Sequence, residues 1–320
     1  MESKLIVSSS PHLHSRQSTQ KIMLKVIIAL IPSVVASVVI FGPKALLITA
    51  VSVCSAVAAE FVCRKVMKRS QTVGDLSAVV TGILLTLNLP VGINPIMAAF
   101  GAAVAIIVVK QMFGGIGQNF VNPALAARII LLVSFPQAMT TWSAPFSYLN
   151  KTDAVTCATP LAQNAADGFS GSYIDLFLGN TGGCLGETCA LAIIIGGVYL
   201  ICSRVISPTI PLVYLGSVAL LALLMGQDPL FHILSGGVML GAFFMATDYT
   251  TSPVTAWGKV IFAIGCAIFT MLIRVYANLP EGVSFSILIM NILVPHIENL
   301  TRPKAFGFVK EKKSRKAAEK

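Results

Sequence analysis

Charged residues are scarce in this chain. Of its 320 residues only 11% are charged and 55% are hydrophobic, and the mean hydropathy is +0.82. A soluble globular domain carries roughly 25% charged residues, so this composition excludes a water-soluble enzyme. The high apolar content also excludes intrinsic disorder, which requires few apolar residues.

The sequence also lacks the cysteine and histidine patterns of metal sites. Its seven cysteines form no C-x-x-C pair, and its four histidines are scattered apart from His12 and His14. Neither a zinc site nor an iron–sulfur cluster is therefore indicated, and no metal is predicted. Residues 1–20 are polar and lack the apolar core of a signal peptide, so we expect the first membrane helix to be retained.

The basic residues are distributed as in a membrane protein of defined topology. The net charge of +10 comes from 23 Lys and Arg against 13 Asp and Glu, and it is concentrated in the N-terminal arm, one loop and the C-terminal tail. No aromatic residues interleave with these charges, so nucleic-acid binding is not predicted. With a cytoplasmic N-terminus, all basic residues except Lys44, Lys151 and Arg274 fall on the inner side, as the positive-inside rule requires.

Ten apolar segments predict an all-α polytopic membrane protein. They cover residues 24–41, 44–62, 75–89, 96–112, 123–135, 187–203, 209–225, 229–246, 258–275 and 282–297. The third and fifth are short for a bilayer that needs ~20 helical residues, and Pro and Asn border both, so we expect broken helices there. The even number places both termini in the cytoplasm and the long loop 136–186 outside.

Weak internal similarity predicts two inverted repeats. Residues 81–88 resemble residues 240–247, and Gly117-Gln-Asn-Phe resembles Gly282-Val-Ser-Phe. The offset corresponds to five helices, and an odd number gives the repeats opposite membrane orientations, with a site at their interface. Chance similarity between apolar helices is the alternative. The predicted parts are an arm (1–23), a first repeat (24–135), the loop (136–186), a second repeat (187–298) and a basic tail (299–320).

The loop contains the most informative stretch, Asp153-Ala-Val-Thr-Cys-Ala-Thr159. By residue type alone it is a turn before a helix, because Asp and Thr are favoured as caps. The stretch resembles Asp-x-x-Ser/Thr-Gly-Ala-Thr, the covalent flavin attachment motif of the NqrB/RnfD family. That family serves the Rnf complex and the Na⁺-translocating NADH:quinone oxidoreductase, Nqr.

The resemblance implies that Thr159 carries FMN through a phosphoester, with Asp153, Thr156 and Ala158 completing the motif. It also implies that a flavin transferase installs the group outside the membrane, using FAD. The sequence departs from the family pattern at Cys157, where Gly is usual. A side chain fits there if φ is negative, whereas a left-handed backbone would be strained.

The resemblance extends over nearly the whole chain, through residues 114–127, 182–192 and 244–253. The short N-terminal arm and the Gly-rich stretch before the sixth helix favour the Rnf branch over NqrB. The resemblance implies a subunit, not catalytic alone, of an ion-translocating oxidoreductase in the bacterial inner membrane, a complex that moves electrons between ferredoxin and NAD⁺ and exports Na⁺ or H⁺. Implied partners are RnfG, the peripheral subunit that carries FMN, and the membrane subunits RnfA and RnfE. The Nqr relative also holds non-covalent riboflavin, so a second flavin is a further expectation.

Several residues are candidate flavin contacts. Gly183 and Gly186 lead into a helix expected near Glu187, where free N–H groups would suit an anion or a flavin carbonyl. Plain helix entry, with Glu187 in the first turn, is the alternative. Asn119 and Asn122 precede the fifth segment. They either cap it, as Asn before Pro commonly does, or contact a second flavin or a cation path.

Two carboxylates are candidates for an ion path. Asp75 begins the third segment and Asp248 ends the eighth. A carboxylate close to the membrane interior is costly unless it is hydrated, paired or functional, although both residues could also be interfacial caps. Glu60, four residues before Arg64, is expected to form a local ion pair.

A passive channel of the five-plus-five type, such as a urea channel, is the competing interpretation from another functional class. In such a channel the broken helices would line a pore and no redox group would be present. The flavin motif favours the electron-transfer subunit, because a channel has no need of it. The sequence leaves open whether Na⁺ or H⁺ is exported.

Overall fold

The computed structural model describes residues 18–149, 157–167, 171–277 and 282–303. Asp153 and Thr156 lie outside these ranges, so their predicted roles stay predictions. Within the described ranges the regular structure is helical and no β-strand occurs. The predicted all-α class is therefore confirmed.

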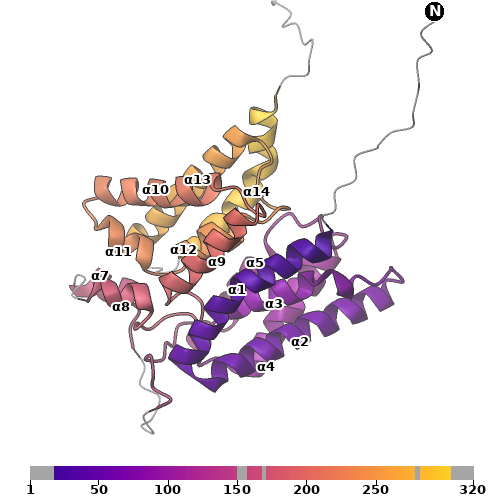
Figure 1. The fold of residues 1–320 in the computed structure, drawn as a ribbon, viewed down its shortest axis with the longest axis horizontal. Helices are drawn as coiled ribbons and strands as arrows, with labels where there is room; N and C mark the ends of the chain where they lie inside the picture. Colours follow the sequence, from indigo (N-terminus) through magenta and orange to yellow (C-terminus); the bar gives the residue numbers. More distant parts are fainter. Residues whose placement is uncertain (1–17, 150–156, 168–170, 278–281, 304–320) are drawn as a thin grey trace, which may run out of the picture.

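The first half of the chain forms one group of helices, drawn in indigo and violet in Figure 1. It contains α1 (Thr19–Phe41), α2 (Pro43–Val66), the 3₁₀ turn η1 (Val73–Asp75), α3 (Ser77–Leu87), α4 (Pro95–Val104) and α5 (Pro123–Ser134). α4 continues into a π-helical stretch, η2 (Ala105–Gln111). Such π-helical segments are rare and are frequent at functional sites.

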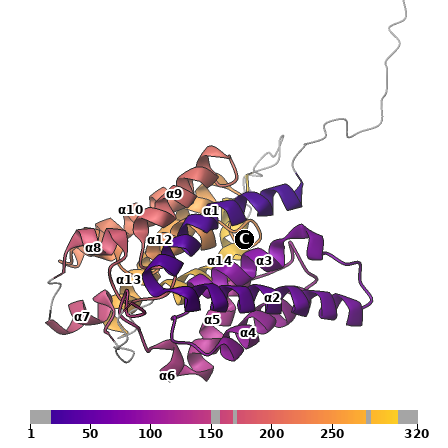
Figure 2. The same cartoon turned by 60° about the horizontal axis from the view of Figure 1, so that its bottom comes forward.

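Three short helices connect the halves: α6 (Pro136–Met139), α7 (Pro160–Asp167) and α8 (Tyr173–Leu178). α7 and α8 lie at one edge of the molecule (Figure 2), where α8 packs on helices of the second half. That half contains α9 (Ala190–Cys202), α10 (Thr209–Leu224), α11 (Pro229–Leu234), α12 (Val238–Leu240) with its π-helical extension η3 (Gly241–Met245), α13 (Ala256–Tyr276) and α14 (Val283–Thr301).

Helical residues cover all ten apolar segments, but their lengths differ. Among the described residues, α1, α2, α13 and α14 are long and apolar enough to cross a membrane. Shorter apolar helices cover the remaining segments. Large apolar side chains are exposed along these elements, for example Val35 and Leu224. This surface suits lipid, whereas the ten-span topology stays a prediction.

One break in the helices differs from the prediction. The eighth segment was expected to be continuous over 229–246, but it is interrupted between α11 and α12. Ser235 is extended, with ψ 144°, and Gly236 has φ +64°. A glycine adopts this left-handed conformation without a steric penalty, so Ser-Gly-Gly at 235–237 ends one helix before the next begins.

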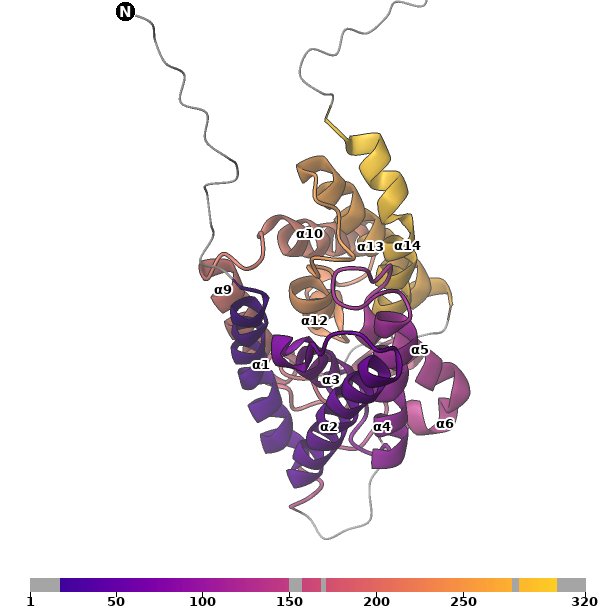
Figure 3. The same cartoon turned by 90° about the vertical axis from the view of Figure 1, so that its right-hand side faces the viewer.

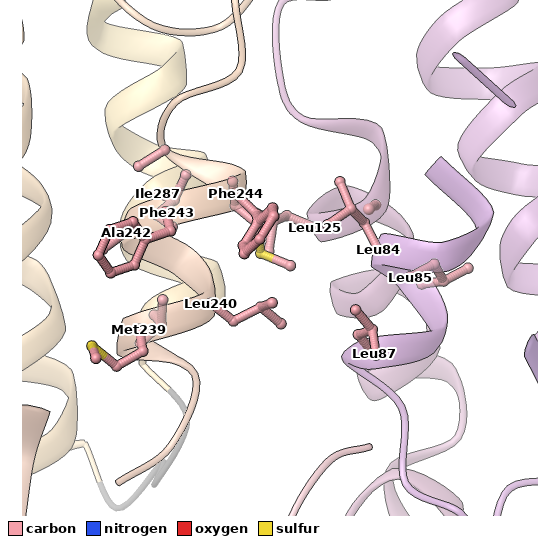
Figure 4. Packing of buried hydrophobic residues seen from close by; sticks show 14 of the residues in the cluster. Leu84, Leu85, Leu87, Leu125, Met239, Leu240, Ala242, Phe243, Phe244 and Ile287 are labelled. Atoms are coloured by element: carbon pink, nitrogen blue, oxygen red, sulfur yellow. The ribbon is translucent and has the colours of Figure 1, made fainter. Parts of the chain in front are cut away.

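The two halves meet where the first helix of each half packs against the first helix of the other, and the last helix of each against the last of the other. α1 packs against α9, and α5 packs against α14 (Figure 3). Between these pairs the two short helices α3 and α12 face one another, and Leu240 of α12 points toward α3 (Figure 4). Leu84, Leu87 and Leu240 are buried in the same apolar core.

Glycine allows the close approach of α1 and α9. A Cβ built on Gly196 of α9 would lie 2.1 Å from the carbonyl oxygen of Ala29 in α1. Small residues commonly permit such backbone contact between membrane helices. The contact that joins the two halves therefore depends on a missing side chain.

We predict that Gly196→Ala lowers the melting temperature of the detergent-solubilised protein. The added methyl group meets backbone and cannot be accommodated by rotating a side chain, which corresponds to about 1–3 kcal/mol of overpacking. The control is Gly216→Ala in α10, because a Cβ at Gly216 meets nothing within 4 Å among the described residues. Equal melting temperatures for both variants would contradict the assigned contact.

Candidate functional site

Thr159 lies at the wall of a small pocket between the loop and the second half. Its side chain is 5% exposed, and its Oγ1 accepts a hydrogen bond from the N–H of Ala162 at 3.3 Å, so it caps the start of α7. We call this space the Thr159 pocket. Its other polar or glycine lining residues are Thr181, Gly182, Gly183, Glu187, Thr188, Ser235 and Gly236.

The pocket brings together three residues that the sequence singled out separately: Thr159, Gly183 and Glu187. Ala158, the neighbouring motif residue, is exposed. The space in the pocket is small, about 20 Å³. A group of a few atoms fits it, and a three-ring flavin does not.

Cys157 is placed beside the pocket by the chain around it. Its N–H donates to the carbonyl of Trp142 at 3.0 Å, and its sulfur would lie 2.2 Å from a Cβ on Gly182. The Cys157 side chain therefore occupies the space that Gly182 leaves free. Burial raises the pKa of the Cys157 thiol, which keeps it protonated and a poor nucleophile at neutral pH.

The Gly-rich stretch packs against the end of α3. The N–H of Leu185 donates to the carbonyl of Leu89 at 3.0 Å, and that of Gly186 donates to the carbonyl of Leu87 at 2.7 Å. A Cβ on Gly186 would lie 2.5 Å from Cβ of Leu87. The Gly186 N–H thus pairs with the carbonyl of Leu87 at the C-terminal end of α3, and the hypothesis that it is offered to a flavin is wrong.

Glu187 is also placed differently from the prediction. The helix begins at Ala190, three residues later than expected, so Glu187 is not in its first turn. Instead, its Oε1 lies 3.4 Å from the guanidinium of Arg128, with both side chains buried. Arg128 also donates to Asn88 Oδ1 at 3.1 Å and to Ser284 Oγ at 2.8 Å. These bonds connect the loop, the end of α3, α5 and α14.

Sequence reasoning missed the role of Arg128, which it counted among inner-side basic residues. It also missed Arg274, whose two terminal nitrogens donate to the carbonyls of His232 and Ser235 at 2.8 and 2.9 Å. These carbonyls end α11, so Arg274 caps the first part of the broken helix. A charged residue inside an apolar segment was the available signal for both.

A second and larger space lies elsewhere in the protein. We call it the Asp248 cavity; its volume is about 410 Å³. Asn119, Asn122 and Asp248 line it, together with residues of α1, α3 and the end of α9. It shares no lining residue with the Thr159 pocket. The candidate flavin contacts of the sequence therefore divide between two places.

The polar residues of the Asp248 cavity differ in how well they are paired. Asn122 Oδ1 accepts the N–H of Ala124 at 3.0 Å, which confirms the predicted cap. Asn119 Oδ1 is buried without a hydrogen-bond partner in the described part of the chain. Asp248 accepts hydrogen bonds from the hydroxyls of Thr250 and Thr251 at 3.0 and 3.2 Å.

Lys110 contributes a positive charge to the wall of this cavity. Its Nζ lies 3.0 Å from both carboxylate oxygens of Glu60 and donates to Ser77 Oγ at 2.7 Å. The expected pair between Glu60 and Arg64 is wrong, since Glu60 pairs with Lys110 while Arg64 donates to the carbonyl of Ser70. Asp75 is half-buried in η1 and does not line the cavity.

The comparisons with known proteins all indicate membership of one family. The model of the NQR2, RnfD, RnfE family matches residues 6–307. The D subunit of the Na⁺-translocating ferredoxin:NAD⁺ oxidoreductase complex of Acetobacterium woodii is 52% identical, over 99% of both chains. The D subunit of the proton-translocating ferredoxin:NAD⁺ oxidoreductase complex of Clostridium ljungdahlii is 42% identical, over 94% of this chain and 96% of the relative. The D subunit of the ion-translocating oxidoreductase complex of Stutzerimonas stutzeri is 39% identical, over 91% and 93%.

We predict that Arg128→Leu destabilises the protein by about 3–5 kcal/mol, because it leaves the buried carboxylate of Glu187 without its partner. Adding Glu187→Leu should restore a large part of this loss, since no isolated charge then remains. Thermal unfolding of the two variants measures the difference. Arg69→Gln, on an exposed arginine, is the control. A double variant no more stable than Arg128→Leu would show that the ion pair is not the interaction that matters.

Proposed function

The chain belongs to the NQR2, RnfD, RnfE family, and from this premise we propose that it is the RnfD subunit of an Rnf-type ion-translocating ferredoxin:NAD⁺ oxidoreductase. Its role is electron transfer within the membrane part of the complex, coupled to the movement of Na⁺ or H⁺. The proposed partners are the peripheral flavoprotein RnfG and the membrane subunits RnfA and RnfE. Ferredoxin and NAD⁺ bind to other subunits.

The proposal for this chain's own chemistry is covalent FMN on Thr159. The observation that carries it is the position of Thr159, which belongs to a sequence resembling the attachment motif and lines a pocket with polar walls. Two wall hydroxyls, those of Thr188 and Ser235, are buried and have no hydrogen-bond partner within the described ranges. Buried polar groups normally have partners, so these residues fit a polar group at Thr159.

A transferase would transfer the FMN part of FAD to Thr159. A bond forms between Oγ1 of Thr159 and the FMN phosphorus, the pyrophosphate bond of FAD breaks, and AMP leaves while the hydroxyl proton is released. Oγ1 keeps lone pairs in the ester, so its cap of α7 is compatible with the modification. The bound flavin supplies one- and two-electron transfer.

The size of the pocket restricts where the flavin ring can be. Only the phosphate end matches a space of about 20 Å³, so we place the ring outside it. Ala158, next to Thr159, is exposed. A small exposed neighbour leaves room both for the transferase and for a peripheral flavoprotein subunit approaching the ring.

The Asp248 cavity is the proposed place of a second, non-covalent riboflavin. Its volume of about 410 Å³ lies in the range of small-molecule sites. Asn119 offers a buried acceptor that no described residue pairs, and Lys110, paired with Glu60, also lines the wall. Asn122, in contrast, is engaged as a cap and as a donor to the carbonyl of Met245.

We further propose the inverted-repeat topology, with both termini cytoplasmic and the flavin loop outside. In each half, a basic residue near the end of the fourth apolar segment donates a hydrogen bond to a serine of the third segment. Lys110 binds Ser77 in the first half, and Arg274 binds Ser235 in the second. Pairing of α1 with α9 and of α5 with α14 suits a pseudo-two-fold axis between the halves.

Asp248 and Asp75 are the proposed residues of the ion path. Asp248 combines a carboxylate with two threonine hydroxyls at the wall of the larger cavity, an oxygen-rich environment suitable for a cation or a proton. Asp75 lies half-buried just before α3. The relatives' names include both Na⁺ and proton translocation, so the ion is left as either.

We predict covalent flavin fluorescence in denaturing gels of the chain expressed with its transferase, and its loss in Thr159→Ala. The reason is that the hydroxyl is the only proposed point of attachment. The control is Thr255→Ala, which removes the equivalent cap of α13 but should leave the fluorescence intact. If wild type stays dark while a known acceptor is labelled in parallel, the covalent flavin is refuted.

Asp248→Asn in the assembled complex should lower the number of ions moved per electron, because the carboxylate charge is removed. Electron transfer and sodium or proton uptake are measured together in vesicles. Asp175→Asn, in α8 and away from the cavity, is the matched control. An unchanged ion-to-electron ratio for Asp248→Asn would remove this residue from the ion path.

A further inference from the structure

Buried polar atoms without partners gather around the Thr159 pocket. Among the described residues, the hydroxyls of Thr188 and Ser235 are unpartnered, and both residues line the pocket. Thr188 is 5% exposed and Ser235 is 1% exposed. In the same described ranges, both ring nitrogens of His232 in α11 are also without a hydrogen-bond partner. So is Nε of Arg274 in α13, the residue that binds the carbonyl of Ser235.

Arg274 brings a positive charge to the same wall. One of its terminal nitrogens would lie 2.7 Å from a Cβ on Gly236, a lining residue of the pocket. Gly236 has φ +64° and no side chain, so the guanidinium approaches the wall directly. The hydrogen bonds from Arg274 to the carbonyls of His232 and Ser235 fix its position.

The charge balance of the pocket is suitable for an anion. Glu187 also lines it, and a carboxylate alone would repel an anion. Arg128 pairs with this carboxylate at 3.4 Å, so the guanidinium of Arg274 is left as an additional positive charge. Hydroxyl donors beside a guanidinium are the groups that bind phosphate oxygens in proteins.

We propose that Thr188 and Ser235, supported by Arg274, bind the phosphate group of the ester formed at Thr159. This inference rests on the covalent attachment proposed above and goes beyond it by assigning the residues that hold the attached group. The small volume of the pocket agrees with a phosphate and not with a ring. Thr188 and Ser235 donate to the phosphate oxygens, and Arg274 positions Ser235 through its carbonyl. The attached flavin is thereby held at a fixed place on the loop.

The proposal predicts that attachment stabilises the protein. Protein produced with the transferase should melt at a higher temperature than the same protein produced without it, because the attached phosphate pairs buried donors. In Ser235→Ala, and separately in Thr188→Val, this rise should fall by at least half. The difference between loaded and unloaded protein is the readout, so a general effect of a substitution on the fold cancels. Measuring two single variants keeps the test valid if one fails to fold.

Ser33→Ala and Ser52→Ala are the matched controls. Both serines are buried in the first half, both hydroxyls lack a partner among the described residues, and neither lines the pocket. They should keep the full rise on loading. Gel fluorescence of each sample reports whether Thr159 is labelled.

The two proposals fail in different ways. An unlabelled wild type refutes the covalent attachment. A labelled wild type whose melting temperature does not rise, or a rise that both pocket variants keep in full, overturns the phosphate site while leaving the attachment intact.

Discussion

Broken helices that end inside the protein impose the main constraint on this fold, because the polar groups at their ends must find partners away from water. The carbonyls at the end of α3 receive the N–H groups of Leu185 and Gly186. The carbonyls at the end of α11 receive the guanidinium of Arg274. Ser235, whose carbonyl Arg274 binds, and Glu187, which follows Gly186 directly, both line the Thr159 pocket, so the candidate site depends in part on how these helix ends are satisfied.

The sequence could predict the helical class and the approximate segments because apolar runs and Pro or Asn breaks are local signals. Asn122 before Pro123, for example, caps α5 as expected. The break at Ser235–Gly237 was missed because one apolar run appeared continuous, although Ser-Gly-Gly was a visible signal. Gly186 was interpreted as a ligand contact because its true partner, Leu87, is far away in the sequence.

The candidate site could be predicted only where its members share a loop. Gly183, Glu187 and Thr159 lie in one region of the chain, and the fold places them in one pocket. The residues that complete the pocket, Ser235 and the supporting Arg274, come from the second half, and nothing in the local pattern connects them with Thr159. Long-range ion pairs such as Arg128 with Glu187 were missed for the same reason, as pairing between distant segments has no periodicity to detect.

Helix α5 connects the Asp248 cavity with the Thr159 pocket, because it lines the cavity and the ion pair of Arg128 with Glu187 links it to the pocket. Ala124, near the start of α5, lines the Asp248 cavity, and Arg128 lies about one helical turn further along. Arg128 pairs with Glu187, which lines the Thr159 pocket. A single rigid helix therefore contacts one space directly and the other through a buried charge pair. Interactions between charges are strong in a poorly solvated interior, so this pair is the buried electrostatic contact through which α5 links the wall of the Asp248 cavity to the wall of the Thr159 pocket.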